Sequence, residues 1–175
     1  MTRTEWDPEN LPNLSGRSYL VTGATRGLGF FACEQLAGAG AHVLLTGRNP
    51  NKMSAAKAAI KRSTPDASIE TLLLDTSNMG SVRAAAATAR ARGRLDGLLL
   101  NAGIVHPPKE RETAGGHELV FATNVLGHFA LAGELLKPLA AAGGRMVWVG
   151  SMSTSIWKHL PTDPELHDGY TPWRA

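Results

Sequence analysis

Thr22-Gly23-Ala24-Thr25-Arg26-Gly27-Leu28-Gly29 is the stretch of sequence that decides the fold. An apolar run at residues 19–21 precedes it, and a helix-compatible segment at residues 30–36 follows it. A strand, a glycine-rich turn and a helix in this order are typical of a site for a dinucleotide pyrophosphate. The free N–H groups at the start of the helix point at the phosphates, and the helix dipole favours their negative charge.

The glycines of this turn have distinct expected roles. Gly23 suits a turn conformation that other residues avoid, Gly27 permits the backbone to approach the ligand, and Gly29 permits the helix to pack on the strand. The spacing is G-x-x-x-G-x-G instead of the standard G-x-G-x-x-G, so a glycine-rich turn without a ligand is the alternative. We expect the turn to contact the ligand through Gly23, Thr25, Arg26, Gly27, Leu28 and Gly29.

The composition narrows the class of protein. The chain has 175 residues, 43% of them hydrophobic, which fits one domain with a sizeable core. The net charge is only +3, so nucleic-acid binding has no compositional support. Cys33 is the only cysteine, which excludes an internal disulfide and fits a reducing cytoplasm. The polar N-terminus differs from a signal peptide, and no apolar run approaches the roughly 20 residues of a membrane span. The histidines lack metal-ligand spacing, so we expect no metal site and interpret them as surface or packing residues.

Apolar runs alternate with helix-compatible segments along the chain. The expected strands cover residues 19–22, 41–46, 68–74, 95–100 and 145–150. The expected helices run from the glycine turn to about residue 39 and over residues 50–62, 77–92 and 117–140, with Ser77 as a cap and Pro138 bending or fraying the last one. This alternation predicts an α/β domain with a doubly wound parallel sheet in the order 3-2-1-4-5. Residues 1–16 are expected to form a loose arm, and residues 17–175 the dinucleotide-binding domain.

Polar or small residues follow each expected strand. Ligands of a doubly wound sheet bind outside the carboxyl ends of the strands, near the switch between the first and fourth. The residues at these ends are Gly23, Thr46-Gly47-Arg48, Asp75, Asn101 and Ser151. Their loops therefore converge on one crevice, which weighs against a turn without a ligand.

These ordered motifs resemble the short-chain dehydrogenase/reductase family. The matching pieces are the glycine turn, Asp75, Asn101-Ala102-Gly103, Asn124 and Ser151. The run from Gly116 to Phe129 is especially similar to the retinol dehydrogenase-like and WW-domain oxidoreductase-like branch. The resemblance covers residues 17 to 175 and implies a Rossmann-type fold. It also implies an oxidoreductase that moves hydride between a nicotinamide cofactor and a carbonyl or alcohol substrate.

The resemblance assigns roles on the cofactor side of the site. It implies that Asp75 contacts the adenine ring, with a helix cap as the alternative. It implies that Asn101, Ala102 and Gly103 line the cofactor, and a strand-ending turn is compatible with that role.

The resemblance also implies roles on the catalytic side. The counterpart of Asn124 supports a water that links the catalytic Lys to solvent, and the alternative is a buried polar side chain with a backbone partner. The counterpart of Ser151 hydrogen-bonds the substrate oxygen. Ser153 and Ser155 are neighbouring candidates, but Ser151 follows the strand directly.

Two arginines favour NADP(H) over NAD(H). An NAD site usually carries an Asp or Glu after the second strand, where it binds the ribose 2′-OH. Here that position carries Thr46-Gly47-Arg48 and no acid, while Arg26 lies within the glycine turn. Guanidinium groups suit a 2′-phosphate because they form charge-assisted and often bidentate hydrogen bonds. The alternatives are a solvated charge for Arg48 and an ordinary turn residue for Arg26.

The sequence departs from the family at the catalytic Y-x-x-x-K motif. Its Tyr is the general acid/base, and its Lys lowers the pKa of that Tyr. Only Tyr19 and Tyr170 occur; the first is followed four residues on by a glycine, and the second by Arg174 with Pro172 between them. By resemblance, the catalytic Tyr would fall just past Ala175.

We therefore expect an incomplete domain that lacks the family's C-terminal strands and helices. The fifth strand and the long helix would then expose apolar surface, and the same side would carry a homo-oligomer contact in a complete chain. The first functional hypothesis is the cofactor-binding part of an NADP-dependent oxidoreductase, inactive by itself. The second is a non-catalytic NADP-binding module that acts as a sensor or partner subunit.

Overall fold

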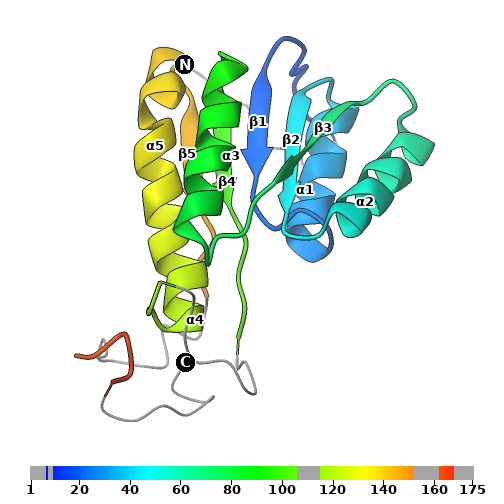
Figure 1. Cartoon of the computed structure of the whole chain (residues 1–175). Helices are drawn as coiled ribbons and strands as arrows, with labels where there is room; N and C mark the ends of the chain where they lie inside the picture. The colour runs from blue at the N-terminus through cyan, green and yellow to red at the C-terminus, as the bar shows by residue number, and fades with distance from the viewer. Residues whose placement is uncertain (1–6, 8–9, 106–114, 152–161, 168–175) are drawn as a thin grey trace.

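The described part of the chain contains a single parallel sheet. The computed structural model describes residues 7, 10–105, 115–151 and 162–167 (Figure 1). The strands are β1 (Ser18–Val21), β2 (His42–Gly47), β3 (Ser68–Leu73), β4 (Gly97–Leu100) and β5 (Arg145–Trp148). They are all parallel and lie in the order β3-β2-β1-β4-β5. The predicted doubly wound topology is confirmed, and the switch in strand order lies between β1 and β4.

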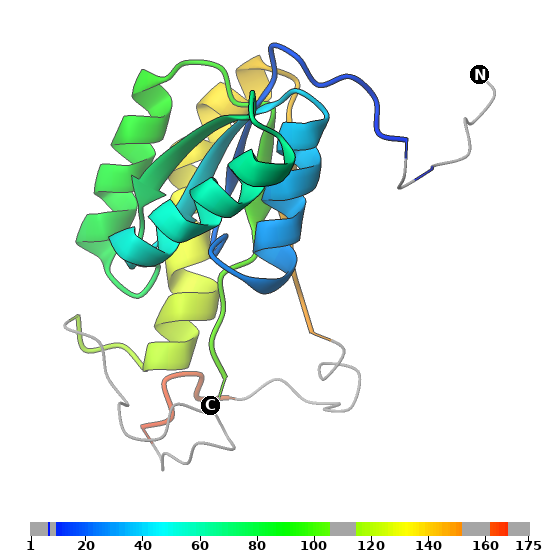
Figure 2. The same cartoon turned by 90° about the vertical axis from the view of Figure 1, so that its right-hand side faces the viewer.

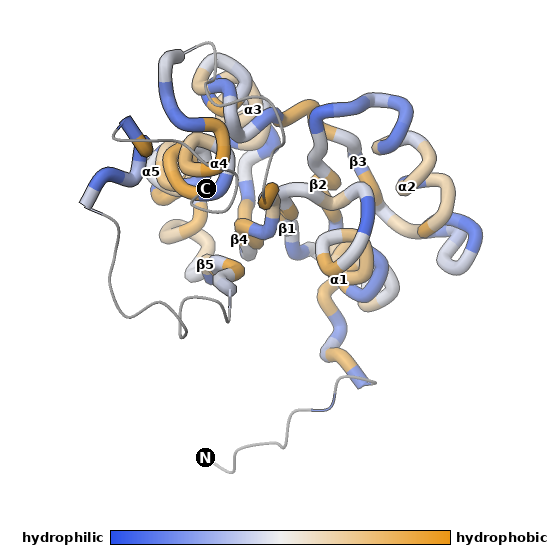
Figure 3. The backbone as a smooth tube through the Cα atoms, turned by 90° about the horizontal axis from the view of Figure 1, so that it is seen from below, coloured by the Kyte–Doolittle hydropathy of each residue, from blue (hydrophilic) through white to orange (hydrophobic). Residues whose placement is uncertain are grey.

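Helices cover both faces of this sheet. Their bounds are α1 (Gly27–Gly38), α2 (Pro50–Ser63), α3 (Met79–Ala91), α4 (Leu119–Phe121), the π-helix η1 (Ala122–Leu126) and α5 (Gly127–Ala141). Figures 2 and 3 show α1 and α2 on one side of the sheet and α3 and α5 on the other. The three layers account for the near-continuous apolar strands, because both faces of each central strand are buried.

Successive strand residues pack into different layers. Leu20 and Leu44 belong to the core beneath α3 and α5. Val21, Val43 and Leu45 belong to the core beneath α1 and α2. Since side chains of a strand alternate between the two faces, both cores are built from the same strands.

Asparagines cap two of the helices, but α1 has no side-chain cap. Asn49 Oδ1 accepts a hydrogen bond from Lys52 N at the start of α2, and Asn78 Oδ1 accepts one from Ser81 N at the start of α3, both at 3.0 Å. The predicted cap at Ser77 is therefore wrong by one residue. α1 begins at the glycine turn without a side-chain cap and without an acidic residue in its first turn. Its first N–H groups are thus left for another partner.

The long helix begins two residues later than predicted and ends close to the predicted residue, without the fraying expected at Pro138. It begins at Leu119, passes through the π-helical turn η1, and continues beyond Pro138 to Ala141. Proline removes the N–H that would bond the carbonyl four residues earlier, which here belongs to Glu134. Arg90 Nη1 on α3 donates to that carbonyl oxygen at 3.2 Å, so the helix does not fray at Pro138.

The same helical run bears on the expectation that no apolar stretch is long enough to span a membrane. By length and composition, Leu119–Ala141 is apolar enough to cross a membrane, with a mean hydropathy of 1.5, whereas no such run was expected from the sequence. The charged residues Glu134 and Lys137 interrupt this run, so its apolar character is an average over the helix. Core helices of soluble proteins have the same character, and Leu131 and Leu135 of this run are fully buried against the sheet.

Apolar side chains are exposed along β5 and α5. Val147 and Trp148 on β5 are 55% and 44% exposed, and Phe129 and Leu136 on α5 are 73% and 57% exposed. The expected exposed apolar surface on this side is confirmed. A homo-oligomer contact there stays a prediction.

Asp96→Asn is expected to cost about 1–2 kcal/mol of stability at neutral pH. Asp96 Oδ2 accepts a hydrogen bond from Ser18 N at 3.0 Å and joins β1 to the residues before β4. The Arg94 guanidinium beside it holds the pKa of Asp96 below its usual range. A carboxylate with a lowered folded-state pKa stabilises above its unfolded pKa of about 4, and this contribution is lost as pH falls through the folded-state pKa.

Urea denaturation of both chains at pH 7 and at lower pH tests this expectation. The difference in unfolding free energy should shrink on acidification, and a difference that stays constant with pH would contradict it. Asp66→Asn removes an exposed carboxylate and is the control, with little expected effect.

Candidate cofactor site

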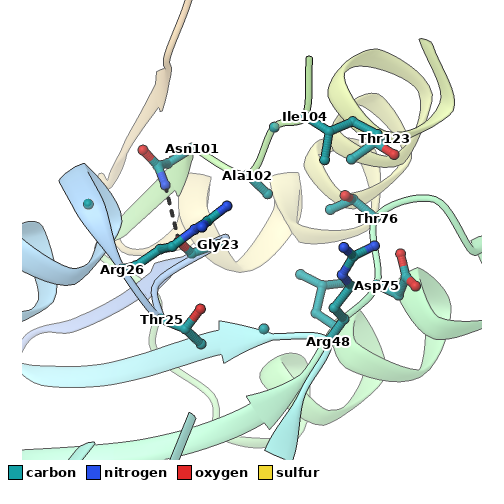
Figure 4. Close-up of a pocket in the computed structure, with 14 residues that line it drawn as sticks. Gly23, Thr25, Arg26, Arg48, Asp75, Thr76, Asn101, Ala102, Ile104 and Thr123 are labelled. Atoms are coloured by element: carbon teal, nitrogen blue, oxygen red, sulfur yellow. Dashed lines mark hydrogen bonds between the residues drawn. The ribbon is translucent and has the colours of Figure 1, made fainter. Parts of the chain in front are cut away.

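A crevice of about 350 Å³ lies at the carboxyl ends of the strands, where the chain switches from β1 to β4 (Figure 4). Its wall comes from the glycine turn and from the segments that follow β2, β3 and β4, together with Thr123 of η1. The predicted cofactor residues that line it are Gly23, Thr25, Arg26, Gly27, Arg48, Asp75, Asn101, Ala102 and Gly103. Leu28 and Gly29, which were also expected to contact the ligand, lie outside this lining.

The glycine turn brings three segments into close contact. Gly23 and Gly27 have φ angles of +65° and +59°, which side chains other than glycine rarely adopt. A Cβ on Gly23 would lie 2.8 Å from Ala102 Cα, and a Cβ on Gly29 would lie 2.8 Å from Gly23 O. Gly29 thus permits the packing of α1 on the turn, whereas the Leu28 side chain is 73% exposed.

Two guanidinium groups enter the crevice from different loops. Arg26 lies at the N-cap of α1, and Arg48 follows β2 directly. Figure 4 shows both side chains reaching into the space between the strand ends. Neither forms an ion pair with the residues that the structure describes, so both charges are available to an anion.

Asp75 organises the turn between β3 and α3. Its Oδ1 accepts hydrogen bonds from Ser77 N at 3.0 Å and Ser77 Oγ at 2.7 Å, and its own N–H donates to Ser81 Oγ at 3.0 Å. It does not cap α3, because Asn78 does. Its side chain also belongs to the crevice wall, and the adenine contact implied by the resemblance stays a prediction.

The segment after β4 is tied to the end of β1. Asn101 Nδ2 donates to Thr22 O at 3.0 Å. It also donates to Gly23 O at 3.4 Å (Figure 4). The backbone N–H groups of Asn101 and Ala102 donate to Thr22 Oγ1 at 2.8 and 2.9 Å. The segment is therefore both a strand-ending turn and part of the crevice wall.

The two predicted catalytic residues lie in different places. Asn124 Oδ1 accepts from Ile104 N, and Asn124 Nδ2 donates to Ile104 O, both at 2.9 Å. Its side chain thus holds the segment after β4 against η1, which is the backbone-partner alternative. Ser151 follows β5 and is exposed, outside the crevice lining. Ser153 and Ser155 lie outside the described residues.

A family model described as short chain dehydrogenase matches residues 17–159. The chain belongs to the short-chain dehydrogenase/reductase family. Among its relatives, a short-chain dehydrogenase/reductase of Aspergillus calidoustus is 39% identical over 142 residues, which cover 78% of this chain and 45% of the relative. A Streptomyces lividans protein named as a probable oxidoreductase is 38% identical over 175 residues, covering 93% of this chain and 54% of the relative. The chain spans about half the length of these curated relatives.

Solved structures of the same fold agree. An uncharacterized protein from Mycobacterium Paratuberculosis superposes with a TM-score of 0.78 at 32% identity, covering 98% of this chain and 60% of that one. A metagenomic short-chain oxidoreductase in complex with NADP superposes with a TM-score of 0.66 at 29% identity, covering 77% of this chain and 61% of that one. The family is thereby established, while the branch resemblance to retinol dehydrogenase-like proteins stays a prediction.

Several residues of this short-chain dehydrogenase/reductase crevice were not predicted. Thr76 and Thr123 line it. Thr76 comes shortly after β3, which is a signal that the sequence offered, whereas Thr123 lies in η1 and has no such signal. His128 is 1% exposed and hydrogen-bonded to Thr22, beyond the surface or packing role expected for it. In the described residues, no cluster of three or more His, Cys, Asp or Glu side chains could hold a metal.

Proposed function

We propose that the crevice binds NADP(H) and that the chain is the cofactor-binding part of an oxidoreductase. Its substrate would be a small molecule with a carbonyl or alcohol group. The observation that carries this proposal is the pair Arg26 and Arg48, whose guanidinium groups line one crevice without a carboxylate partner among the described residues. An NAD site would place an acid after β2, where this chain has Arg48 and Asn49.

The residues present fit a dinucleotide. The uncapped N-terminus of α1 offers backbone N–H groups to a pyrophosphate, and Gly23 and Gly27 keep side chains out of its path. Arg26 and Arg48 would hold the 2′-phosphate, and Asp75 the adenine. When bound, the nicotinamide donates or accepts the hydride. The wall formed by Ala102 and its neighbours would hold the nicotinamide half in place.

On the substrate side, Ser151 would hydrogen-bond the reacting oxygen. The proton transfer needs a Tyr with a neighbouring Lys, and no Y-x-x-x-K pattern occurs in the 175 residues. We therefore expect the 175-residue chain to bind NADPH without turning over ketones or aldehydes.

The single cysteine, Cys33, fits a reducing compartment such as the cytoplasm. Its burial raises the pKa of the thiol to about 12 and leaves the thiol unreactive.

A non-catalytic NADP-binding module is the second candidate. It rests on the same crevice, which the described residues form by themselves, and it needs no Y-x-x-x-K pattern. Calorimetry with NADPH and a turnover assay separate the candidates when they are applied both to this chain and to its gene product. Turnover by a gene product that continues through Y-x-x-x-K favours the enzyme, and binding without turnover by a gene product that ends at Ala175 favours the module.

Arg48→Ala is expected to weaken NADPH binding by about tenfold to a hundredfold, because a charge-assisted hydrogen bond contributes roughly 1.5–3 kcal/mol. NADH lacks the 2′-phosphate, so its weaker binding should change by less than about threefold. Calorimetric titration of both cofactors into both chains measures the two ratios. Arg62→Ala, an exposed arginine at the other end of α2, is the control. Equal loss of NADH and NADPH affinity would refute a 2′-phosphate contact.

A further inference from the structure

His128 is a buried side chain at which four elements of the site meet. Its Nε2 lies 3.0 Å from Thr22 Oγ1, at the end of β1. Its Nδ1 lies 3.2 Å from the main-chain oxygen of Asn124 in η1. Its ring meets the Trp148 ring of β5 edge to face, with centroids 5.8 Å apart and planes at 88°. The imidazole itself belongs to the first turn of α5.

The hydrogen-bond partners define which nitrogen carries the proton. A carbonyl oxygen can only accept, so Nδ1 must donate to the oxygen of Asn124. In the neutral ring Nε2 then has a free lone pair and accepts from the Thr22 hydroxyl. Burial lowers the pKa of His128, and the hydrogen bond to Asn124 opposes this effect only in part. Desolvation thus favours the neutral form that this arrangement requires.

The Thr22 hydroxyl then has a hydrogen-bond partner for its proton and for each of its two lone pairs. It donates to His128, and its two lone pairs accept the N–H groups of Asn101 and Ala102 at 2.8 and 2.9 Å. The Leu99 carbonyl oxygen, 3.4 Å away, is a more distant alternative acceptor. Without a ring acceptor at His128, the hydroxyl would turn to Leu99, and its lone pairs would leave the direction of the two N–H groups.

We infer that His128 is a positioning residue for the cofactor, which acts through Thr22 to set the crevice wall at Asn101 and Ala102. This inference rests on the proposed function, because the wall it sets is the one proposed to hold the nicotinamide half. The contacts of His128 also join the cofactor wall to η1, which contains Asn124, and to β5, which precedes Ser151.

The tautomer of His128 can be measured in the unmodified chain. Long-range ¹H–¹⁵N correlation spectra distinguish a ring protonated at Nδ1 from one protonated at Nε2. We expect the Nδ1–H form at neutral pH, with Nε2 as the acceptor. A ring protonated at Nε2 or at both nitrogens would overturn the inference, since Thr22 could not then donate to it. This measurement needs neither a variant nor a cofactor.

His128→Phe keeps an aromatic ring against Trp148 and removes both nitrogens. We expect its NADPH dissociation constant to rise about tenfold, the size of one lost hydrogen bond to a buried partner. Thr22→Val should weaken binding similarly, and the double variant should be no weaker than the single ones, because both act through one hydroxyl. His42→Phe, at a half-exposed histidine near the start of β2, is the control and should bind NADPH like the native chain.

The outcomes separate the inference from the proposed function. Native NADPH affinity in a folded His128→Phe chain, beside weak binding by Thr22→Val, would reduce His128 to a packing residue. If the native chain fails to bind NADPH, the proposed function is wrong, and the amide resonances of Asn101 and Ala102 decide the inference. These resonances should shift in His128→Phe and stay in place in His42→Phe. If they do not shift in His128→Phe, the inference is overturned.

Discussion

Gly127→Ala is expected to destabilise the fold by at least about 3 kcal/mol, or to prevent folding. Gly127 is the first residue of α5, where the helix crosses the turn after β3. A Cβ there would overlap the carbonyl oxygen of Thr76 and lie 2.7 Å from its carbonyl carbon. A backbone carbonyl cannot rotate away as a side chain can, so the helix and the turn would have to separate. Urea or thermal denaturation of both chains measures the loss.

The same helix offers a matched control for this variant. Gly133 also lies in α5, but a Cβ there would have no atom within 4 Å. Gly133→Ala should therefore stabilise the chain by up to about 1 kcal/mol, the helix-propensity gain. Loss of stability at Gly133, or a change at Gly127 no larger than about 1 kcal/mol, would show that helix propensity and not the contact with Thr76 governs these positions.

The clash at Gly127 would reach the cofactor crevice as well. Thr76 is 4% exposed and lines the crevice wall next to Asp75. The carbonyl that Gly127 accommodates is therefore part of the same turn that carries the proposed adenine contact. The stability of α5 and the shape of the crevice therefore both depend on the close approach of the Gly127 backbone to the Thr76 carbonyl.

Sheet topology was predictable because local pattern and global order agree. Neighbouring strand residues such as Val43 and Leu44 point to opposite faces of the sheet, and both are apolar. A parallel sheet between two layers of helices buries both faces. Caps and helix ends were less predictable, because they depend on contacts between distant segments. Pro138 would end an isolated helix, but Arg90 of α3 satisfies the carbonyl that the proline leaves free.

The crevice was predictable to the extent that its residues follow strands. Gly23, Arg48, Asp75 and Asn101 stand at carboxyl ends of parallel strands, which must meet at one edge of the sheet. His128 follows no strand and has no motif spacing to mark it. Its partners are brought together only by the fold, 106 residues away in the case of Thr22, so the sequence alone carries no sign of the hydrogen bond.

Gly29→Ala is expected to weaken NADPH binding by more than about a hundredfold, because a clash of about 3 kcal/mol would fall on the binding turn itself. A Cβ at Gly29 would lie 2.6 Å from Asn101 Nδ2, 2.8 Å from Gly23 O and 3.1 Å from Ala24 Cα. Two of these atoms are backbone, so α1 would have to move off the turn. The helix start that offers its N–H groups to the pyrophosphate would move with it. Calorimetric titration of NADPH measures the affinity, and circular dichroism verifies that the variant is folded.

Gly38→Ala is the matched control, since Gly38 ends the same helix and a Cβ there would meet no atom within 4 Å. It should bind NADPH like the native chain. If Gly29→Ala folds and binds NADPH as tightly as Gly38→Ala, the pyrophosphate does not rest on the start of α1. The dinucleotide would then lie elsewhere, and the 2′-phosphate contact proposed for Arg26 at the same helix start would fail with it. If both variants lose affinity equally, helix α1 as a whole is sensitive, and the close approach at Gly29 is not the cause.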